Sequence, residues 1–119
     1  MDTKDIIREI LINPRHDIND RGLIIIASEA IAKTKDEKAL PYLIYTLARN
    51  NFIQDGNEDT AVIHTLMIRK LADAIQKITD LEINVAELDV DNPGQVNKVL
   101  SMAKSWAKQK GIKLFEENK

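Results

Sequence analysis

The chain has 119 residues, of which 44% are hydrophobic and 30% charged, and this composition is typical of a globular protein. We therefore predict a single domain over residues 1–119. The net charge of -2 argues against a nucleic-acid partner, because such partners select a cationic surface. The chain contains no cysteine, which excludes disulfides, thiolate metal sites and cysteine nucleophiles.

Neither a leader nor a membrane segment is predicted. Residues 1–5 are polar and acidic rather than cationic, as a signal peptide would require. The longest apolar run, 23–27, is far too short to cross a bilayer. We therefore expect a cytoplasmic protein with no membrane partner.

The first half of the chain predicts three helices. One covers 3–12, and a second runs from Asn19 or Asp20 to Lys33. The second is apolar on more than one side and should be covered on two faces. A third covers 36–49 with Asp36 as its cap, and Pro41 requires that it start near Ala39 or bend there. Each helix has a predicted buried stripe. The stripe is Ile6, Ile7, Ile10 and Leu11 in the first helix; Leu23, Ile24, Ala27, Ala30 and Ile31, extended by Ile25 and Ile26, in the second; and Leu40, Leu43, Ile44 and Leu47 in the third.

The second half predicts two more helices joined by an extended connector. Residues 59–79 keep helical spacing, 80–93 lose it, and 94–109 regain it. Gly111 should end the last helix, and the apolar residues after it should fold back over its last turn. The predicted buried residues are Ile63, Leu66, Met67, Leu71, Ala74, Ile75 and Ile78; Ile83, Val85, Leu88 and Val90 in the connector; and Val96, Val99, Leu100, Ala103 and Ala107. The fold class is all-α.

Two segments of the chain echo each other at an offset of 44 residues, since Ala30-Ile31 aligns with Ala74-Ile75 and Asp36 with Asp80. Residues 68–80 read Ile-Arg-Lys-Leu-Ala-Asp-Ala-Ile-Gln-Lys-Ile-Thr-Asp, and residues 36–44 read Asp-Glu-Lys-Ala-Leu-Pro-Tyr-Leu-Ile. Over about 20–80 the chain resembles HEAT repeats, whose helices commonly carry this order of residues. The resemblance implies about two antiparallel helical hairpins, stacked as a compact HEAT-like α–α superhelix of about five helices.

The sequence offers little for catalysis. Its two histidines, His16 and His64, are not followed by glutamate, so the paired His-Glu motifs of HEAT-like di-iron enzymes are missing. The acidic turns beginning at Asp55 and Asp89 carry leucine where a calcium loop needs its twelfth-position glutamate. We therefore expect no catalytic residue, no metal and no cofactor.

Two surfaces are candidate binding sites. The first is one side of the third helix, with Tyr42, Tyr45, Arg49 and Phe52 at helical spacing; the alternative is a second packing face against the first or last helix. The second is a cationic face of the last helix formed by Lys98, Lys104 and Lys108. The alternative is a solvent-exposed helix face whose positive charge balances the acidic residues of the connector, Asp80, Glu82, Glu87, Asp89 and Asp91. Trp106 could be a core anchor or an interface anchor.

Together these features favour a non-catalytic protein–protein interaction or scaffold module that presents a helical surface to a protein partner. One alternative is a homo-oligomeric structural protein that self-associates through its helical faces. A less favoured alternative is a small-molecule-binding protein or enzyme, with a pocket between the second helix, the fourth helix and the acidic connector.

Overall fold

The computed structural model describes residues 3–12, 18–50, 58–89 and 92–115. These residues contain five α-helices: α1 (Thr3–Ile12), α2 (Ile18–Thr34), α3 (Leu40–Arg49), α4 (Glu58–Thr79) and α5 (Pro93–Gln109). Two short 3-10 turns, η1 (Glu37–Ala39) and η2 (Val85–Glu87), precede α3 and α5. No strand occurs in this described part, which confirms the all-α class. Within it, no helix is both long and apolar enough to span a bilayer.

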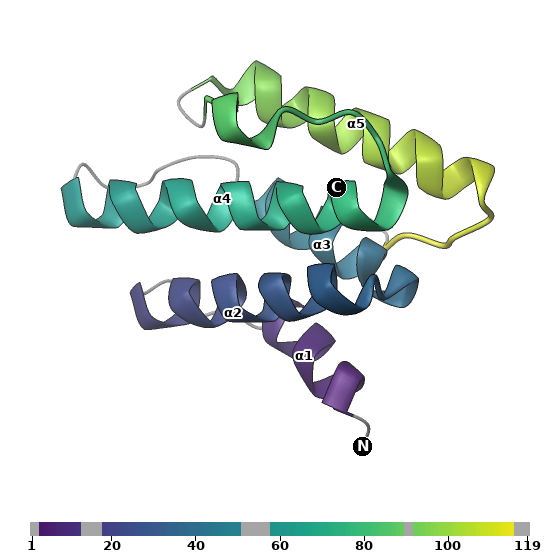
Figure 1. Cartoon of the computed structure of the whole chain (residues 1–119), viewed down its shortest axis with the longest axis horizontal. Coiled ribbons are helices and arrows are strands. Elements are labelled where there is room, and N and C mark those ends of the chain that lie inside the picture. The colour runs from purple at the N-terminus through teal and green to yellow at the C-terminus, as the bar shows by residue number, and fades with distance from the viewer. Residues whose placement is uncertain (1–2, 13–17, 51–57, 90–91, 116–119) are drawn as a thin grey trace.

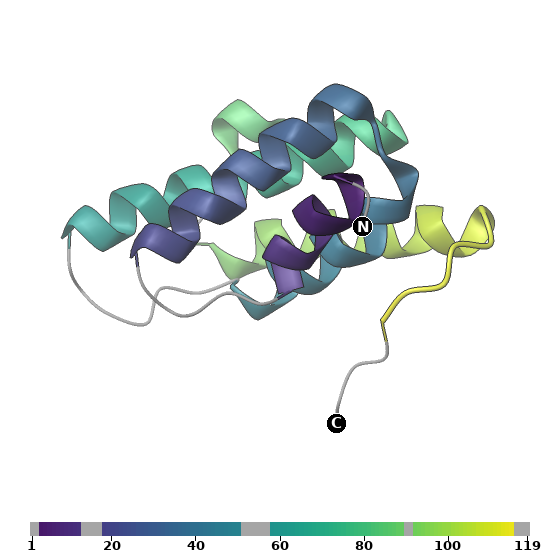
Figure 2. The ribbon, with the colours of Figure 1, turned by 90° about the horizontal axis from the view of Figure 1, so that it is seen from below.

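The helices form two layers. Helices α2 and α4 lie side by side and run in the same direction, whereas α1, α3 and α5 lie in the other layer (Figures 1 and 2). Helix α4 contacts α2, α3 and α5, and it therefore occupies the centre of the molecule. At most 1% of the surface of each of six α4 core residues is exposed, and these residues are Met67, Ile68, Leu71, Ala72, Ala74 and Ile75.

The start of α3 shows how Pro41 is accommodated. Pro41 occupies the first turn of α3, where the missing N–H removes no intrahelical hydrogen bond. The Asp36 side chain instead caps the preceding turn η1 and accepts a hydrogen bond from the Lys38 backbone N–H at 3.3 Å. Of the two predicted alternatives, the helix that starts near Ala39 is therefore correct.

Three helices end at a residue with left-handed backbone conformation. Lys35 follows α2 with φ of 51°, Asp80 follows α4 with φ of 57°, and Gly111 follows α5 with φ of 71°. After α5, the Ile112 N–H donates to the Ala107 carbonyl at 2.9 Å, closing the helix end. Gly111 thus ends α5 as predicted. The segment that follows Gly111 reaches α3, where Phe115 packs against Tyr42 and Tyr45.

Several aliphatic residues predicted to be buried are exposed. Ile6 of α1 and Leu23 of α2 are about half exposed, and so is Leu66 of α4. Ile26 is 64% exposed, but Ile25 is buried and α2 contacts both α1 and α4. Helix α2 is therefore covered by two neighbours, as predicted, and Ile26 lies on the side that neither of them covers. The physical reason is geometric: neighbouring helices cover a narrower arc of each helix than its apolar residues occupy. The half-buried members of the predicted stripes are Ile7, Ile10, Ala30, Ile63 and Val85, and Val90 lies outside the described residues. Burial is confirmed at Leu11, Ile24, Ile25, Ala27, Ile31, Leu40, Leu43, Ile44, Leu47, Met67, Leu71, Ala74, Ile75, Ile78, Ile83, Leu88, Val96, Val99, Leu100, Ala103 and Ala107.

Two polar contacts fix α1 against the start and middle of α3. The buried Thr46 hydroxyl donates to the Leu11 carbonyl at 2.6 Å. Because Leu11 lies in the last turn of α1, its carbonyl has no partner further along that helix. The Arg8 guanidinium forms an ion pair with Asp36 at 3.3 Å, and both side chains are largely buried.

We predict that Thr46→Val destabilises the protein by about 2 kcal/mol, because valine has nearly the same shape but leaves the Leu11 carbonyl buried and unsatisfied. Urea denaturation monitored by circular dichroism measures the change. Thr46→Ser keeps the hydroxyl and should cost less than Thr46→Val. A Thr46→Val protein as stable as the wild type would contradict this account of how α1 is held.

Candidate functional site

The tyrosine face predicted on α3 is partly covered by the protein's own C-terminal segment. The Phe115 ring packs edge-on against Tyr42, with ring centroids 4.9 Å apart, and against Tyr45 at 5.5 Å. Both tyrosines are half-buried. Such aromatic pairs contribute about 0.5–1.5 kcal/mol each beyond their buried area. Phe115 therefore covers part of this face.

Arginines flank the same face. The Arg8 guanidinium lies 6.0 Å from the centroid of the Tyr42 ring, and that of Arg49 lies 5.2 Å from the Tyr45 ring. Arg49 also donates to the Ile12 carbonyl at 3.5 Å, which links α3 to the end of α1. Phe52 lies outside the described residues. The tyrosine face thus has internal contacts with α1 and the C-terminal segment, and its role in partner binding remains a prediction.

The three lysines predicted as one cationic face lie in different surroundings. Lys98 is exposed and lines a groove beside the connector between α4 and α5. Lys104 is half-buried, and Lys108, one turn further along the same face of α5, is exposed. A binding role for these lysines stays a prediction.

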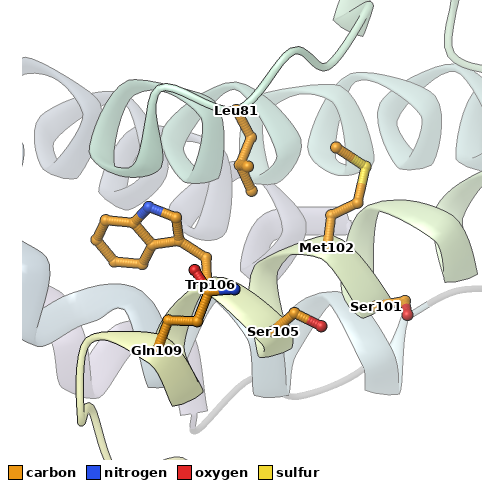
Figure 3. A pocket seen from close by; sticks show the side chains of 6 residues that line it. All are labelled: Leu81, Ser101, Met102, Ser105, Trp106 and Gln109. Carbon is orange, nitrogen blue, oxygen red and sulfur yellow. The ribbon is translucent and has the colours of Figure 1, made fainter.

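An open groove runs along α5, between this helix and the connector, whose described residues are 80–89. Its first half has a volume of about 310 Å³. Leu81 points from the connector toward α5, between Trp106 and Met102 (Figure 3). Ser101 and Ser105 are exposed along the α5 side, and Gln109 closes the lining. We call this part the apolar half of the α5 groove.

The second half of the α5 groove is larger, about 440 Å³, and its lining contains charged side chains, which the lining of the first half does not. Met102 lines both halves, so they are adjacent. Two carboxylates of the connector and one ammonium group of α5 contribute to the lining, and we call this part the acidic half. It is lined by Glu82, Ile83, Asn84, Glu87, Leu88, Gln95, Lys98, Val99 and Met102.

Side chains of α4 hold the connector that forms one wall of the groove. The Gln76 amide donates to the Ile83 carbonyl at 2.9 Å, and the Arg69 guanidinium donates to the Leu88 carbonyl at 3.3 Å. Gln76 and Arg69 are two helical turns apart and share a face of α4. These hydrogen bonds give the Ile83 and Leu88 carbonyls their partners. The side chains of Ile83 and Leu88 are also buried. The wall is therefore fixed to the core and does not depend on a ligand for its position.

The groove was not predicted as a site. Sequence reasoning singled out Lys98, Trp106 and the acidic connector separately, but it did not join them. Trp106 is half-buried against the core, as expected of a core anchor, and it also lines the groove. Its role as an interface anchor stays a prediction. Nothing in the local pattern marked Leu81, Met102 or Ser105, because only the path of the connector brings them together.

A second apolar surface lies along the seam between α2 and α4. Lys70 of α4 forms an ion pair with Glu29 of α2 at 2.9 Å. Ile26 precedes Glu29 by one turn and Leu66 precedes Lys70 by one turn, so both flank the same side of this seam. Val62, one further turn back on α4, is 68% exposed. We call Ile26, Val62 and Leu66 the α2–α4 seam.

The histidines give no sign of a metal centre. His64 is only 3% exposed and lies within α4. His16 lies outside the described residues. In the part of the chain that the structure describes, no cluster of three histidine, aspartate or glutamate side chains could hold a metal ion.

Comparison with known proteins finds no match for this chain among family models, curated protein sequences or solved structures. The HEAT-like resemblance of residues 20–80 is therefore a prediction from the sequence, whereas the all-α fold and the grooves are features of the structure.

We predict that Phe115→Leu makes Tyr42 and Tyr45 more reactive toward nitration, because the edge-on ring that covers them is lost while an apolar side chain remains. The melting temperature should fall only slightly, since Phe115 is itself 40% exposed and two partly exposed ring contacts contribute about 1 kcal/mol. Mass spectrometry of the nitrated protein gives the modification rate of each tyrosine. Equal rates in wild type and variant would show that Phe115 does not cover this face.

Proposed function

We propose that the protein is a non-catalytic interaction module that uses the α5 groove to bind a short segment of a protein partner. The single observation that carries this proposal is the half-buried Trp106 at the wall of an open, two-part groove. Tryptophan is enriched among residues that dominate protein interfaces, because it offers a large apolar surface at little entropic cost. Its neighbours Leu81 and Met102 extend that apolar surface.

The shape of the groove favours a peptide over an enclosed small molecule. Both halves are open to solvent, and the lining runs along α5 from Gln95 to Gln109. At about 1.5 Å rise per helical residue this distance is about 21 Å. An extended peptide at about 3.3 Å per residue would cover it with six or seven residues. The fixed connector also lowers the entropic cost of binding, since one wall needs no ordering.

The proposal predicts that Ser105→Tyr abolishes peptide binding. The probe is a random library of peptides of about eight residues, matched to the groove length derived above from strand geometry. Ser105 is exposed, so a tyrosine there should fill the apolar half without disturbing the core. Peptides selected on the wild-type protein should bind Ser105→Tyr at least about tenfold more weakly, a loss of about 1.4 kcal/mol. Fluorescence anisotropy of the labelled peptides measures the affinity.

Lys108→Tyr is the matched control, because it places the same side chain on α5 outside the groove lining. Its binding should equal that of the wild type, and the melting temperatures of both variants should stay close to the wild-type value. If selected peptides bind Ser105→Tyr and Lys108→Tyr equally well, the groove is not the binding site.

A second candidate function is self-association, and the exposed α2–α4 seam is the observation that favours it. The exposed fractions are 64% for Ile26 and 68% for Val62, which is unusual for aliphatic residues that adjoin each other on packed helices. The charges next to the seam, Glu29 and Lys70, already neutralise each other. An identical seam would therefore meet no like-charge repulsion from this pair.

This second function predicts that the apparent mass from light scattering rises with protein concentration, and that the double substitution Ile26→Lys, Val62→Lys returns the protein to a monomer. The lysines place charge in an interface that would otherwise be desolvated. Ile6→Lys is the control, because Ile6 is also exposed but lies on α1, in the other layer. A wild-type protein that stays monomeric at all concentrations would rule self-association out.

A further inference from the structure

The α5 groove differs in charge between its two halves. In the acidic half, the carboxylates of Glu82 and Glu87 line the connector side, and Lys98 lines the α5 side. Asp80 and Asp89, also exposed, add negative charge to the same connector. The apolar half has no charged residue in its lining, and the Lys110 ammonium lies 5.6 Å from the Trp106 ring at the end of α5. The groove therefore presents an uncharged site that contains Leu81, Met102 and Trp106 directly beside a site of net negative charge.

The acidic half is also structurally prepared. The Asn84 side chain donates a hydrogen bond to Glu87 Oε2 at 2.7 Å, which orients that carboxylate. The Gln95 side chain accepts from the Asp89 backbone N–H at 2.8 Å and ties the end of the connector to the first part of α5. Carboxylates that are already positioned lose less side-chain entropy when they bind a cation. Binding of a cation to these carboxylates is therefore more favourable in free energy.

We propose that the α5 groove recognises a segment in which a large apolar side chain lies next to lysine or arginine. The apolar side chain packs among Leu81, Met102 and Trp106, and the cation lies between Glu82 and Glu87. This inference rests on the proposed function and adds the chemistry of the partner. An acidic segment would be disfavoured, because its carboxylate would meet the two glutamates in a partly desolvated groove.

Substitutions of Lys98 and of the two glutamates test the proposal, because they should change peptide affinity in opposite directions. If Lys98 competes with the partner's cation for the two glutamates, Lys98→Glu should raise the affinity of selected peptides, by about two- to fivefold for an exposed charge. Glu82→Gln and Glu87→Gln should each lower it by a similar factor. Lys98→Gln should fall between the wild type and Lys98→Glu. A role of Lys98 in folding alone would not produce this order.

The experiment uses the full chain and the peptides whose binding is lost in Ser105→Tyr. We expect these peptides to be enriched in lysine or arginine beside an apolar residue, relative to the unselected library. Their affinity should fall when ionic strength rises from about 0.01 M to about 1 M, because the screening length shortens from about 30 Å to about 3 Å. Circular dichroism of each charge variant verifies that its fold is intact.

The outcomes separate this inference from the proposed function. Groove-dependent peptides that are acidic or uncharged, or that are unaffected by the Glu82, Glu87 and Lys98 substitutions, would overturn the partner chemistry and leave the binding site in place. If no selected peptide depends on Ser105, both the inference and the proposed function are overturned.

Discussion

The packing of α4 against α2 is the contact on which the rest of the structure depends. The two helices run side by side in one layer, and α4 also contacts α3 and α5 of the other layer. The α4 residues Met67, Leu71 and Ile75 are fully buried, and burying a side chain of this size stabilises the fold by about 1.5–3 kcal/mol. Alanines at 72 and 74 are buried as well, and their small size allows the neighbouring helices to approach closely.

The α5 groove follows from this central position of α4. One face of α4 is buried, and from another face Gln76 and Arg69 hold the connector by its carbonyl groups. The connector therefore follows α4 instead of packing fully against α5, and an open groove is left between them. Helix α4 thus provides stability and holds one wall of the groove, while side chains of the connector and of α5 line it. The proposed binding requires no rearrangement of the core.

The helices could be predicted from the sequence more completely than the site. Aliphatic spacing located α1, α2, α4 and α5 within one or two residues, because burial of apolar stripes decides where helices form. For α3 the range 36–49 begins four residues too early, and only the alternative that Pro41 requires, a start near Ala39, matches Leu40. The left-handed ends at Lys35 and Asp80 could not be foreseen, since only Gly111 carries the residue type that favours this conformation. Periodicity also could not show that Ile26 and Leu66 are exposed, because it reports where apolar residues lie and not which of them a neighbour covers.

The candidate site depends on contacts between distant parts of the chain. Tyr42 and Tyr45 were correctly grouped on one side of α3, but no local pattern indicated that Phe115 returns to pack on them. Likewise, Leu81 meets Trp106 only because the connector follows α4. The groove does not depend on the resemblance to HEAT repeats, because the side chains that line it lie outside the matched residues 20–80.

The most direct test of the central claim is to map, by two-dimensional amide NMR on the full chain, where a selected peptide binds. The account predicts that the largest shift changes fall on amides of residues 81–89 and 98–109, and that the indole N–H of Trp106, the only tryptophan, shifts with them. Changes confined to the α2–α4 seam or to the tyrosine face of α3, with the Trp106 signal unmoved, would contradict it.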